Sequence, residues 1–386
     1  MTCLTRRETL AAGVALAAAA CTSLPQDPAG PAGAAPDSLN GLAKTKGLAF
    51  GSCLGGGKDS YSFRDPQVRA LMIEQCGMLV PENELKWVAL RPDAKSFDFT
   101  RADVLIAFGE THGMKIRGHT LLWHNMQWFP EWLKTYDFGP RPAAEAERLL
   151  REHITTVCTR YGTRIFSYDV VNETIDAKTG EMRDTVFTRH LGDKVIDIAF
   201  DAAKQAAPHA KLVYNDYMSW GPGNAVHRAG VLKLLARLRK NNVPVDTLGV
   251  QSHIGPGASD STPQYGAAED KDWRAFLDEA TAMGLDLAIT EFDVGDQVLP
   301  ADVAVRDKMV ADMARSYLDA MFSYPQLRTV MAWGLVDKYS WLRNRWPRAD
   351  GLPKRPSPYD DDYQPKPLRE AIADSFRSAP TRAATT

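Results

Sequence analysis

The sequence predicts a single (β/α)8 barrel, the TIM-barrel fold of the α/β class, and three observations support this prediction. From residue 47 onward, short β-rich apolar runs alternate with segments of helical period, as expected for strand–helix units around a parallel sheet. The alternation repeats eight times. Most of the predicted strands are followed by polar residues. Barrel enzymes carry their catalytic residues at these positions, where strands end and loops begin.

The strands are predicted from short apolar runs, which cover residues 48–52, 78–81, 115–120, 167–172, 211–215, 247–251, 286–290 and 329–333. The clearest helices have apolar residues three and four positions apart, and they cover residues 143–161, 194–207, 225–242, 272–283 and 302–322. An open doubly wound sheet is the alternative, but it usually has a spaced glycine pattern after its first strand. Gly55-Gly56-Gly57 lacks that spacing and indicates a flexible loop.

The domain boundaries follow from composition. Arg6 and Arg7 precede a short run of small apolar residues, so residues 1–24 are predicted to be an export signal of the twin-arginine type. Residues 25–38 are rich in Pro, Ala and Gly and indicate a linker. Residues 39–378 form the predicted barrel domain, and residues 379–386 form a short tail. We expect export to the periplasm or to the outside of the cell.

The segment around Cys21 leaves two outcomes open. Ala18-Ala19-Ala20-Cys21 resembles a lipoprotein cleavage box, which would leave a lipid anchor on Cys21, but it also fits an ordinary small-residue cleavage site. The apolar run is shorter than the roughly 20 residues needed to span a bilayer, and no later segment is apolar enough. We therefore predict no integral membrane segment.

Charge and cysteine content exclude several classes of protein. The chain has 46 Lys and Arg against 48 Asp and Glu, so it has no basic excess for binding nucleic acid. Cys53, Cys76 and Cys158 are too few for a disulfide scaffold; a Cys53–Cys76 bridge stays open, and buried free thiols are expected. The eight histidines show no paired ligand motif, so we expect no metal or cofactor, and we expect a monomer.

Polar residues stand at the ends of most predicted strands. In strand order these are Glu82 and Asn83, His119, Asn172 and Glu173, Asn215 and Asp216, Gln251 and His253, and Glu291, with Trp333 ending the eighth strand. One such residue could be a helix cap. Six sets on one rim predict a single polar pocket.

Two glutamates in this set permit a specific chemistry. Glu173 and Glu291 follow the fourth and seventh strands, so barrel closure can place them on opposite sides of one cleft. Glycoside hydrolysis with retention needs one carboxylic acid and one nucleophilic carboxylate with different pKa values. A lone glutamate at a strand end is more often part of a structural ion pair.

Ordered motifs give the chain a resemblance to a known family. They are Glu82-Asn83-Glu84-Leu85-Lys86-Trp87, Arg117-Gly118-His119-Thr120-Leu121-Leu122-Trp123-His124, Asp169-Val170-Val171-Asn172-Glu173, Asn215-Asp216-Tyr217, Gly249-Val250-Gln251-Ser252-His253, Ile289-Thr290-Glu291-Phe292-Asp293 and Trp333-Gly334-Leu335-Val336-Asp337-Lys338-Tyr339-Ser340-Trp341. Over roughly residues 42–373 the chain resembles glycoside hydrolase family 10, the endo-β-1,4-xylanases.

The resemblance implies a role for each matching residue. Glu173 is expected to be the general acid/base and Glu291 the nucleophile, while Asn172 is expected to bond the sugar 2-hydroxyl. His253 and Asp293 are expected to orient Glu291 and keep it ionised. The residues expected to bind sugars are Glu82, Asn83, Lys86, His119 and Gln251 on the non-reducing side, Trp333 and Trp341 by stacking, and Tyr217 on the product side. Trp123 is expected to be structural.

The predicted function is therefore a retaining endo-β-1,4-xylanase that cleaves xylan or xylo-oligosaccharides. Two alternatives stay open: the same machinery acting on other β-1,4-glucans or aryl glycosides, and a catalytically silent carbohydrate-binding barrel. The loop after the eighth strand carries Arg343 and Arg345 among mixed charges, which usually indicates a solvated loop. We also consider that its arginines favour acidic decorations on xylan.

Overall fold

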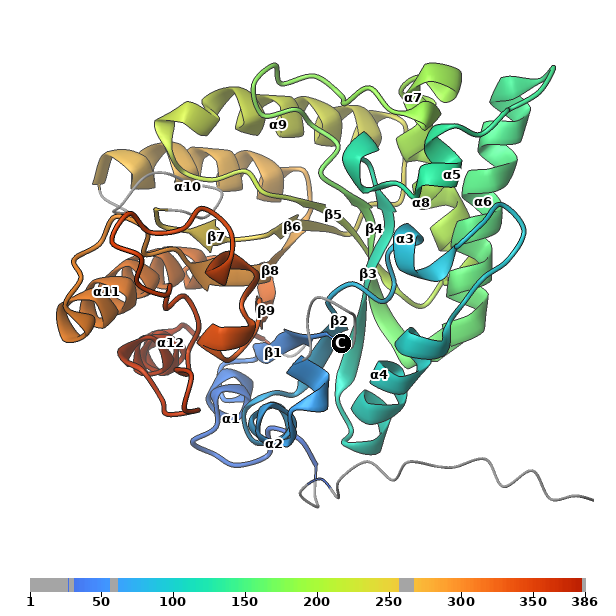
Figure 1. Ribbon diagram of the computed structural model, residues 1–386. Helices are drawn as coiled ribbons and strands as arrows, with labels where there is room; N and C mark the ends of the chain where they lie inside the picture. The colour runs from blue at the N-terminus through green and yellow to red at the C-terminus, as the bar shows by residue number, and fades with distance from the viewer. Residues whose placement is uncertain (1–26, 28–30, 56–61, 257–266, 384–386) are drawn as a thin grey trace, which may run out of the picture.

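Eight parallel strands close into a ring, which confirms the predicted barrel (Figure 1). The computed structural model describes residues 27, 31–55, 62–256 and 267–383. Strand β1 pairs with β2 and β9, and the pairing of β6 with β8 closes the ring. A two-residue strand, β7, extends the edge of β8. The strands are β1 (Ala49–Leu54), β2 (Met78–Pro81), β3 (Lys115–Trp123), β4 (Ile165–Asn172), β5 (Lys211–Asp216), β6 (Thr247–Val250), β7 (His253–Ile254), β8 (Asp286–Val294) and β9 (Leu327–Ala332).

Helices surround the ring on its outer side, as Figure 1 shows. A helix that packs outside the barrel follows each barrel strand, as the repeat pattern predicted. The helices are α1 (Leu39–Lys44), α2 (Pro66–Gln75), α3 (Trp87–Leu90), α4 (Thr100–Thr111), α5 (Glu131–Lys134), α6 (Pro142–Tyr161), α7 (Val186–Leu191), α8 (Lys194–Ala206), α9 (Ala225–Lys240), α10 (Ala267–Ala282), α11 (Val303–Phe322) and α12 (Pro367–Ser378).

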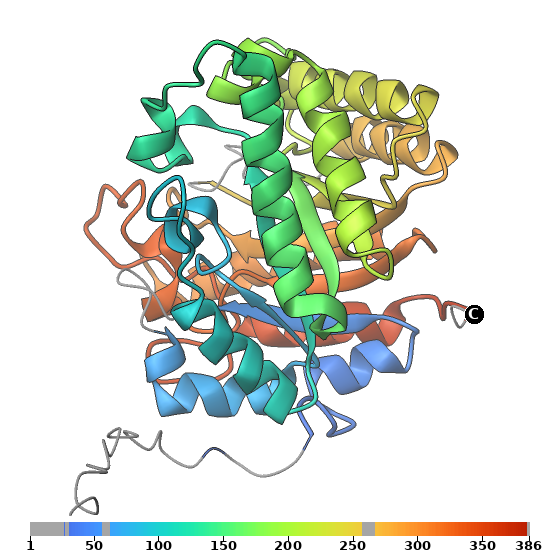
Figure 2. The same ribbon diagram turned by 90° about the vertical axis from the view of Figure 1, so that its right-hand side faces the viewer.

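Helix α6 illustrates how the sequence specifies these elements. Its buried residues include Leu150, Ile154, Val157 and Tyr161, which recur three and four positions apart and form one apolar face. The helix ends at Tyr161, and the following residue, Gly162, has a φ of 49° that glycine adopts without a Cβ clash. Figure 2 shows α6 lying beside α8 across the outside of the barrel. The apolar spacing in the sequence and the burial in the structure therefore agree along this segment.

The packed domain begins before residue 39. Ala32 is buried, its backbone N–H donates to the carbonyl of His112, and the N–H of Gly33 donates to Ile73. Ser38 caps α1 by accepting from the Gly41 N–H at 2.9 Å. Residues 31–38, which the composition assigned to a linker, thus pack against the barrel. The predicted export signal and Cys21 lie outside the described residues.

The segment after α12 is also anchored. The Arg382 guanidinium is buried and donates to the carbonyl oxygens of Leu327 at 3.0 Å and Phe322 at 2.8 Å. Its backbone N–H donates to Lys46. The predicted tail therefore closes the end of the barrel where the strands begin, which is opposite the loops discussed below (Figure 2).

Several strands run further than predicted. β3 continues past His119 to Trp123, and its register against β4 shifts between His119 and Leu122. β8 continues past Glu291 to Val294, with a register shift against β9 between Ile289 and Phe292. The predicted strand ends at Thr120 and Thr290 were thus too early, because bulges extend the pairing beyond the regular alternation.

Cys53, Cys76 and Cys158 are buried free thiols, so the possible bridge between Cys53 and Cys76 is not formed. Burial raises the pKa of the Cys53 and Cys76 thiols. No helix among the described residues has the length and apolar character required to cross a membrane.

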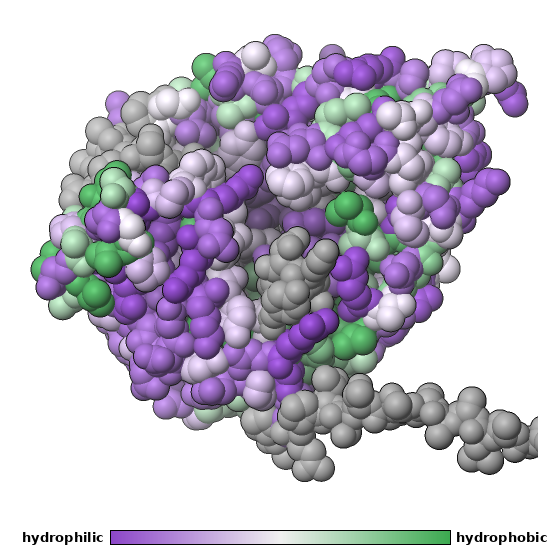
Figure 3. Space-filling view, in the orientation of Figure 1, coloured by the Kyte–Doolittle hydropathy of each residue, from purple (hydrophilic) through white to green (hydrophobic). Residues whose placement is uncertain are grey.

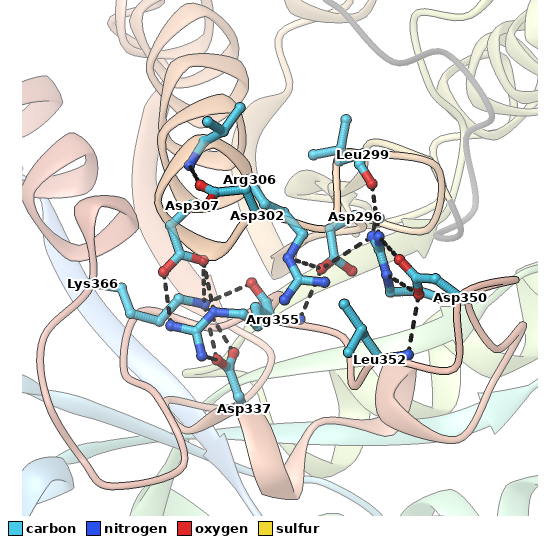
Figure 4. Close-up of polar contacts among 12 residues, drawn as sticks. Asp296, Leu299, Asp302, Arg306, Asp307, Asp337, Asp350, Leu352, Arg355 and Lys366 are labelled. Atoms are coloured by element: carbon cyan, nitrogen blue, oxygen red, sulfur yellow. Dashed lines mark hydrogen bonds and ion pairs between the residues drawn. The ribbon is translucent and has the colours of Figure 1, made fainter.

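A buried ion-pair network fixes the loop between β9 and α12, which covers residues 333–366 and is called the β9–α12 loop (Figure 4). Lys366 donates to Asp337 at 3.0 Å, and both side chains are almost fully buried. Arg355 pairs with Asp307 of α11 at 2.7 Å. Arg348 donates to the carbonyl of Leu299 at 2.7 Å. The Lys366–Asp337 pair lies within the loop, and the other two contacts attach the loop to α11 and to the segment that precedes it.

Replacing Asp337 with alanine is expected to lower the free energy of unfolding by about 3–5 kcal/mol, because it leaves the Lys366 ammonium group buried without its carboxylate. Chemical denaturation at pH 7 measures the loss. The matched control is Asp312→Ala on α11, which removes an exposed partner of Lys308 and should cost less than about 1 kcal/mol. The double variant Asp337→Leu/Lys366→Met should regain most of the loss; a double variant as unstable as Asp337→Ala would contradict this account.

Candidate active site

The predicted site residues gather at the end of the barrel where the strands finish. Figure 1 looks onto this end, and in Figure 2 its loops lie on the left, away from the C-terminus. The corresponding surface is hollowed near its centre, and mainly hydrophilic residues border the hollow (Figure 3). This is the end at which barrel enzymes carry their reactive groups.

Glu291 lies in β8 and is 5% exposed. Its Oε1 accepts from Asn215 Nδ2 at 2.8 Å, and Asn215 Oδ1 accepts from Thr290 Oγ1 at 2.6 Å. Consecutive residues of a regular strand point to opposite faces, yet Thr290 and Glu291 both reach Asn215. The register shift in β8 explains this, since it breaks the alternation at these two residues.

A chain of polar contacts leads away from Glu291. His253 Nε2 lies 3.4 Å from Glu291 Oε2, and its Nδ1 lies 2.9 Å from Asp293 Oδ1. Trp341 donates its indole N–H to Asp293 Oδ2 at 2.7 Å. The β9–α12 loop thus holds Asp293, which in turn orients His253 toward Glu291.

Charge keeps Glu291 ionised. Burial alone would raise the pKa of this carboxyl, but the nearby charges of His119 and His253 and the hydrogen bond from His253 lower it to about 2. Burial disfavours the charged form of His253, yet the carboxylates of Asp293 and Glu291 raise its pKa to about 10. At neutral pH the pair is therefore a carboxylate beside an imidazolium.

Glu173 follows β4, and its backbone conformation and contacts fix its position. Its φ is 55°, a left-handed conformation that is uncommon for residues other than glycine and costs about 1–2 kcal/mol. Arg183 Nε donates to the Glu173 carbonyl at 3.0 Å, and Arg183 Nη2 donates to the Tyr217 hydroxyl at 2.7 Å. Gln251 donates to the Glu173 carboxyl at 3.0 Å. These contacts fix the direction of the side chain.

The pKa of Glu173 moves in the opposite direction to that of Glu291. Burial raises it most, the hydrogen bonds from Gln251 and Trp123 oppose the rise, and the negative charges of Asp216 and Glu291 add to it. Asn215 joins the two carboxyls, because it also donates to Asn172 Oδ1 at 2.9 Å and Asn172 lies 3.4 Å from Glu173. One hydrogen-bonded set thus holds two carboxyls whose pKa values are shifted in opposite directions.

The residues expected to bind sugars on the non-reducing side lie on one flank of the pocket. Lys86 is buried and donates to Asn83 Oδ1 at 2.9 Å, and its ammonium lies 4.6 Å from the centre of the Trp123 ring. Glu82 is half-buried at the end of β2 and lines a small cavity together with Trp333. His119 packs edge-on against Trp333, with ring centres 5.3 Å apart.

Tyr217 lies on the other flank, where Arg183 joins it to Glu173. It is half-buried and packs against His227 with ring centres 4.7 Å apart. Arg183 also lines an open depression of about 300 Å³ together with Asn125 and Asp176. All thirteen predicted site residues are therefore brought to this end of the barrel.

Three residues of the site were not assigned a role from the sequence. Asn215 contacts both Asn172 and Glu291, and its place at a strand end was the available signal. Asp169 accepts from His119 Nδ1 at 2.8 Å and also pairs with Arg117, so it fixes the imidazole ring. Arg183 gives no sequence signal, because its role depends on how the segment after β4 folds back.

The arrangement suits acid–base and nucleophilic work by carboxyl groups. Among the described residues, no cluster of three or more His, Cys, Asp or Glu side chains has the arrangement of a metal site. Two carboxyls in a shared pocket whose pKa values are shifted in opposite directions can divide the work of proton donation and nucleophilic attack between them.

Comparison with known proteins identifies the same family that the sequence motifs resemble. The family model described as glycosyl hydrolase family 10 matches residues 38–375. An endo-1,4-beta-xylanase A of Phanerodontia chrysosporium is 30% identical, with 88% of this chain and 77% of that protein covered.

Solved structures agree with the sequence matches. The native xylanase 10B of Thermotoga maritima superposes with a TM-score of 0.77 at 28% identity, covering 88% of this chain and 98% of that chain. The xylanase 10B of Thermotoga petrophila RKU-1 in complex with xylobiose gives the same TM-score and identity, covering 88% and 97%.

Proposed function

Because the chain belongs to glycosyl hydrolase family 10, we propose that it is an endo-1,4-β-xylanase that cleaves internal bonds of xylan or xylo-oligosaccharides with retention of configuration. The observation that carries the proposal is the opposite direction of the two carboxyl pKa values in one pocket. A retaining mechanism requires this division between an acid and a nucleophile. Relatives named endo-1,4-beta-xylanase support the substrate class.

The first step forms a covalent intermediate. Glu173 gives its proton to the glycosidic oxygen while a Glu291 carboxylate oxygen attacks the anomeric carbon, so the bond to the leaving sugar breaks and a glycosyl ester forms. The positive charge on His253 keeps Glu291 ionised and available. Asn172 lies beside the Glu173 carboxyl and contacts Asn215, which also donates to Glu291, so Asn172 is suited to bonding the sugar 2-hydroxyl.

The second step releases the sugar. Glu173, now a carboxylate, takes a proton from water as the water oxygen attacks the anomeric carbon, and Glu291 leaves as a carboxylate. Two displacements restore the original configuration. In this proposal Lys86, Asn83, Glu82, His119 and Gln251 bind the sugars that stay attached, Trp333 and Trp341 stack on them, and Tyr217 contacts the departing chain.

The proposal is tested by reducing-sugar release from xylan and soluble cellulose by the purified protein, side by side at neutral pH. Release from xylan alone, with a product that NMR shows to be the β-anomer at first, is the expected result. Comparable release from cellulose would favour a broader β-1,4-glucanase. No release from either polymer, together with binding of xylo-oligosaccharides, would indicate a silent barrel.

The location of the protein completes the proposal. We infer that residues 1–24 direct export of the protein. The signal is then either removed by cleavage before residue 25 or processed so that a lipid anchor is attached to Cys21. Cell fractionation of the native host protein distinguishes a free form from a membrane-anchored form.

The pH profile of kcat/KM is expected to lose activity on its alkaline side as Glu173 releases its proton, since Glu291 is already ionised at lower pH. Replacing Asp216 with asparagine removes a negative charge that raises the pKa of Glu173, so the alkaline limb should move to lower pH. Asp184→Asn, in an exposed pair with Arg189, is the control and should leave the profile in place. A limb that moves to higher pH in Asp216→Asn would contradict the assignment.

A further inference from the structure

Arg345 occupies an unusual position in the β9–α12 loop. Its side chain is exposed, and its guanidinium carbon lies over three indole rings, at 5.3 Å from the centre of Trp341, 5.4 Å from Trp346 and 5.9 Å from Trp128. Trp341 and Trp346 belong to the same loop, but Trp128 belongs to the segment after β3. Arg345 therefore reaches from one side of the site to the other.

These rings connect Arg345 to the reactive groups. Trp341 donates to Asp293, which contacts His253 beside Glu291. On the opposite side, Trp128 stacks on Trp123 with ring centres 4.7 Å apart and planes 15° apart. A single tryptophan ring thus separates Arg345 from Asp293 on one side and from Trp123 on the other. Substituents on a sugar bound at the proposed cleavage point would therefore come close to its guanidinium group.

Arg345 also differs from the other basic residues of the loop in its charge partners. Five of them face a carboxylate: Lys338 with Asp65 at 3.9 Å, Arg343 with Asp361 at 2.7 Å, Arg348 with Asp350 at 2.5 Å, Arg355 with Asp307 at 2.7 Å and Lys366 with Asp337 at 3.0 Å. Within the part of the chain that the structure describes, no carboxylate pairs with Arg345. Its positive charge is held in place by aromatic rings and left without a counter-charge.

The geometry points to a carboxylate as the missing partner. Aromatic rings hold a guanidinium group by its flat face, which leaves its in-plane N–H groups available to outside acceptors. Those groups match a carboxylate in two parallel hydrogen bonds, about twice as strong as bonds to a neutral hydroxyl. We propose that Arg345 binds the carboxylate of a uronic-acid substituent on a sugar chain in the cleft, an inference that rests on the proposed function. The sequence offered Arg343 for the same role, but its guanidinium group already pairs with Asp361.

Carboxyl-reduced glucuronoxylan isolates the charge, because it keeps the branch but replaces the carboxylate with a neutral hydroxymethyl group. The ratio of kcat/KM on glucuronoxylan to that on the reduced polymer should exceed one in the wild-type protein. Arg345→Gln should lower this ratio about 2- to 5-fold, consistent with loss of a charge-assisted pair at an exposed site. Arg345→Lys should keep part of the ratio, and added salt should weaken it.

Arg343→Gln is the matched control and should leave the ratio unchanged. An unchanged ratio in Arg345→Gln, or an equal fall in Arg343→Gln, would overturn the inference. Linear xylan in the same assay reports on the proposed function separately. If no xylan is cleaved, titration of tryptophan fluorescence with an acidic and a carboxyl-reduced xylo-oligosaccharide decides the matter: tighter acidic binding that depends on Arg345 supports the inference, and equal binding overturns it.

Discussion

Replacing Glu291 with alanine is expected to lower kcat/KM about 10⁴- to 10⁶-fold on every substrate, the range found when a covalent hydrolase loses a member of its nucleophilic machinery. The loss should not depend on the leaving group, because no glycosyl ester can form. Kinetics on xylan and on dinitrophenyl xylobioside measure it. Glu279→Ala on the outer side of α10 is the control and should keep full activity.

Added azide separates this role from any other. In Glu291→Ala the small anion can occupy the space of the missing carboxylate and attack the anomeric carbon from the same side. The product should be the inverted α-glycosyl azide, formed as the dinitrophenolate leaves. A β-glycosyl azide would show that the nucleophile is still present and that Glu291 is not it.

Replacing Glu173 with alanine is expected to divide substrates by their leaving groups. On xylan kcat/KM should fall about 10²- to 10⁴-fold, the usual contribution of a general acid. On dinitrophenyl xylobioside kcat/KM should change little, because dinitrophenolate needs no proton to leave. The second step still lacks its base, so kcat and KM should fall together and the glycosyl ester should accumulate.

Mass spectrometry of the quenched Glu173→Ala protein detects this ester as an added xylobiosyl mass on the peptide that contains Glu291. Azide should here give the β-glycosyl azide, because it attacks the covalent intermediate. Equal losses of kcat/KM on both substrates would contradict the assignment of acid and nucleophile, provided that Glu173→Ala melts at the wild-type temperature.

The barrel could be predicted because each strand and helix is specified by the pattern of apolar residues within its own segment. Strand β2 and helix α6 each carry a pattern of burial that their own residues specify, and their predicted bounds differ from the structure by at most one residue. The extensions of β3 and β8 could not be predicted in this way. They depend on bulges, which arise from pairing between strands that are distant in sequence.

The site was predictable at the level of residue identity and less so at the level of contacts. Glu173 and Glu291 stand out because polar residues at strand ends must meet when a barrel closes. The function of Arg183 depends on a left-handed residue at position 173 and on the path of the following segment. The sequence also does not separate Arg343 from Arg345, since both are arginines in one charged loop. The structure separates them, because Arg343 pairs with Asp361 and Arg345 lies over three indole rings.

The buried ion pairs beneath the β9–α12 loop have a consequence for how the protein responds to heat. Functional loops often open at temperatures well below the melting point of the scaffold, so activity disappears first. Here Arg355 and Lys366 join the loop that carries Trp341 to Asp307 of α11, and Asp337 holds Lys366 in place within the loop. The loop should therefore open only when the barrel itself does, so that loss of activity on warming coincides with global unfolding.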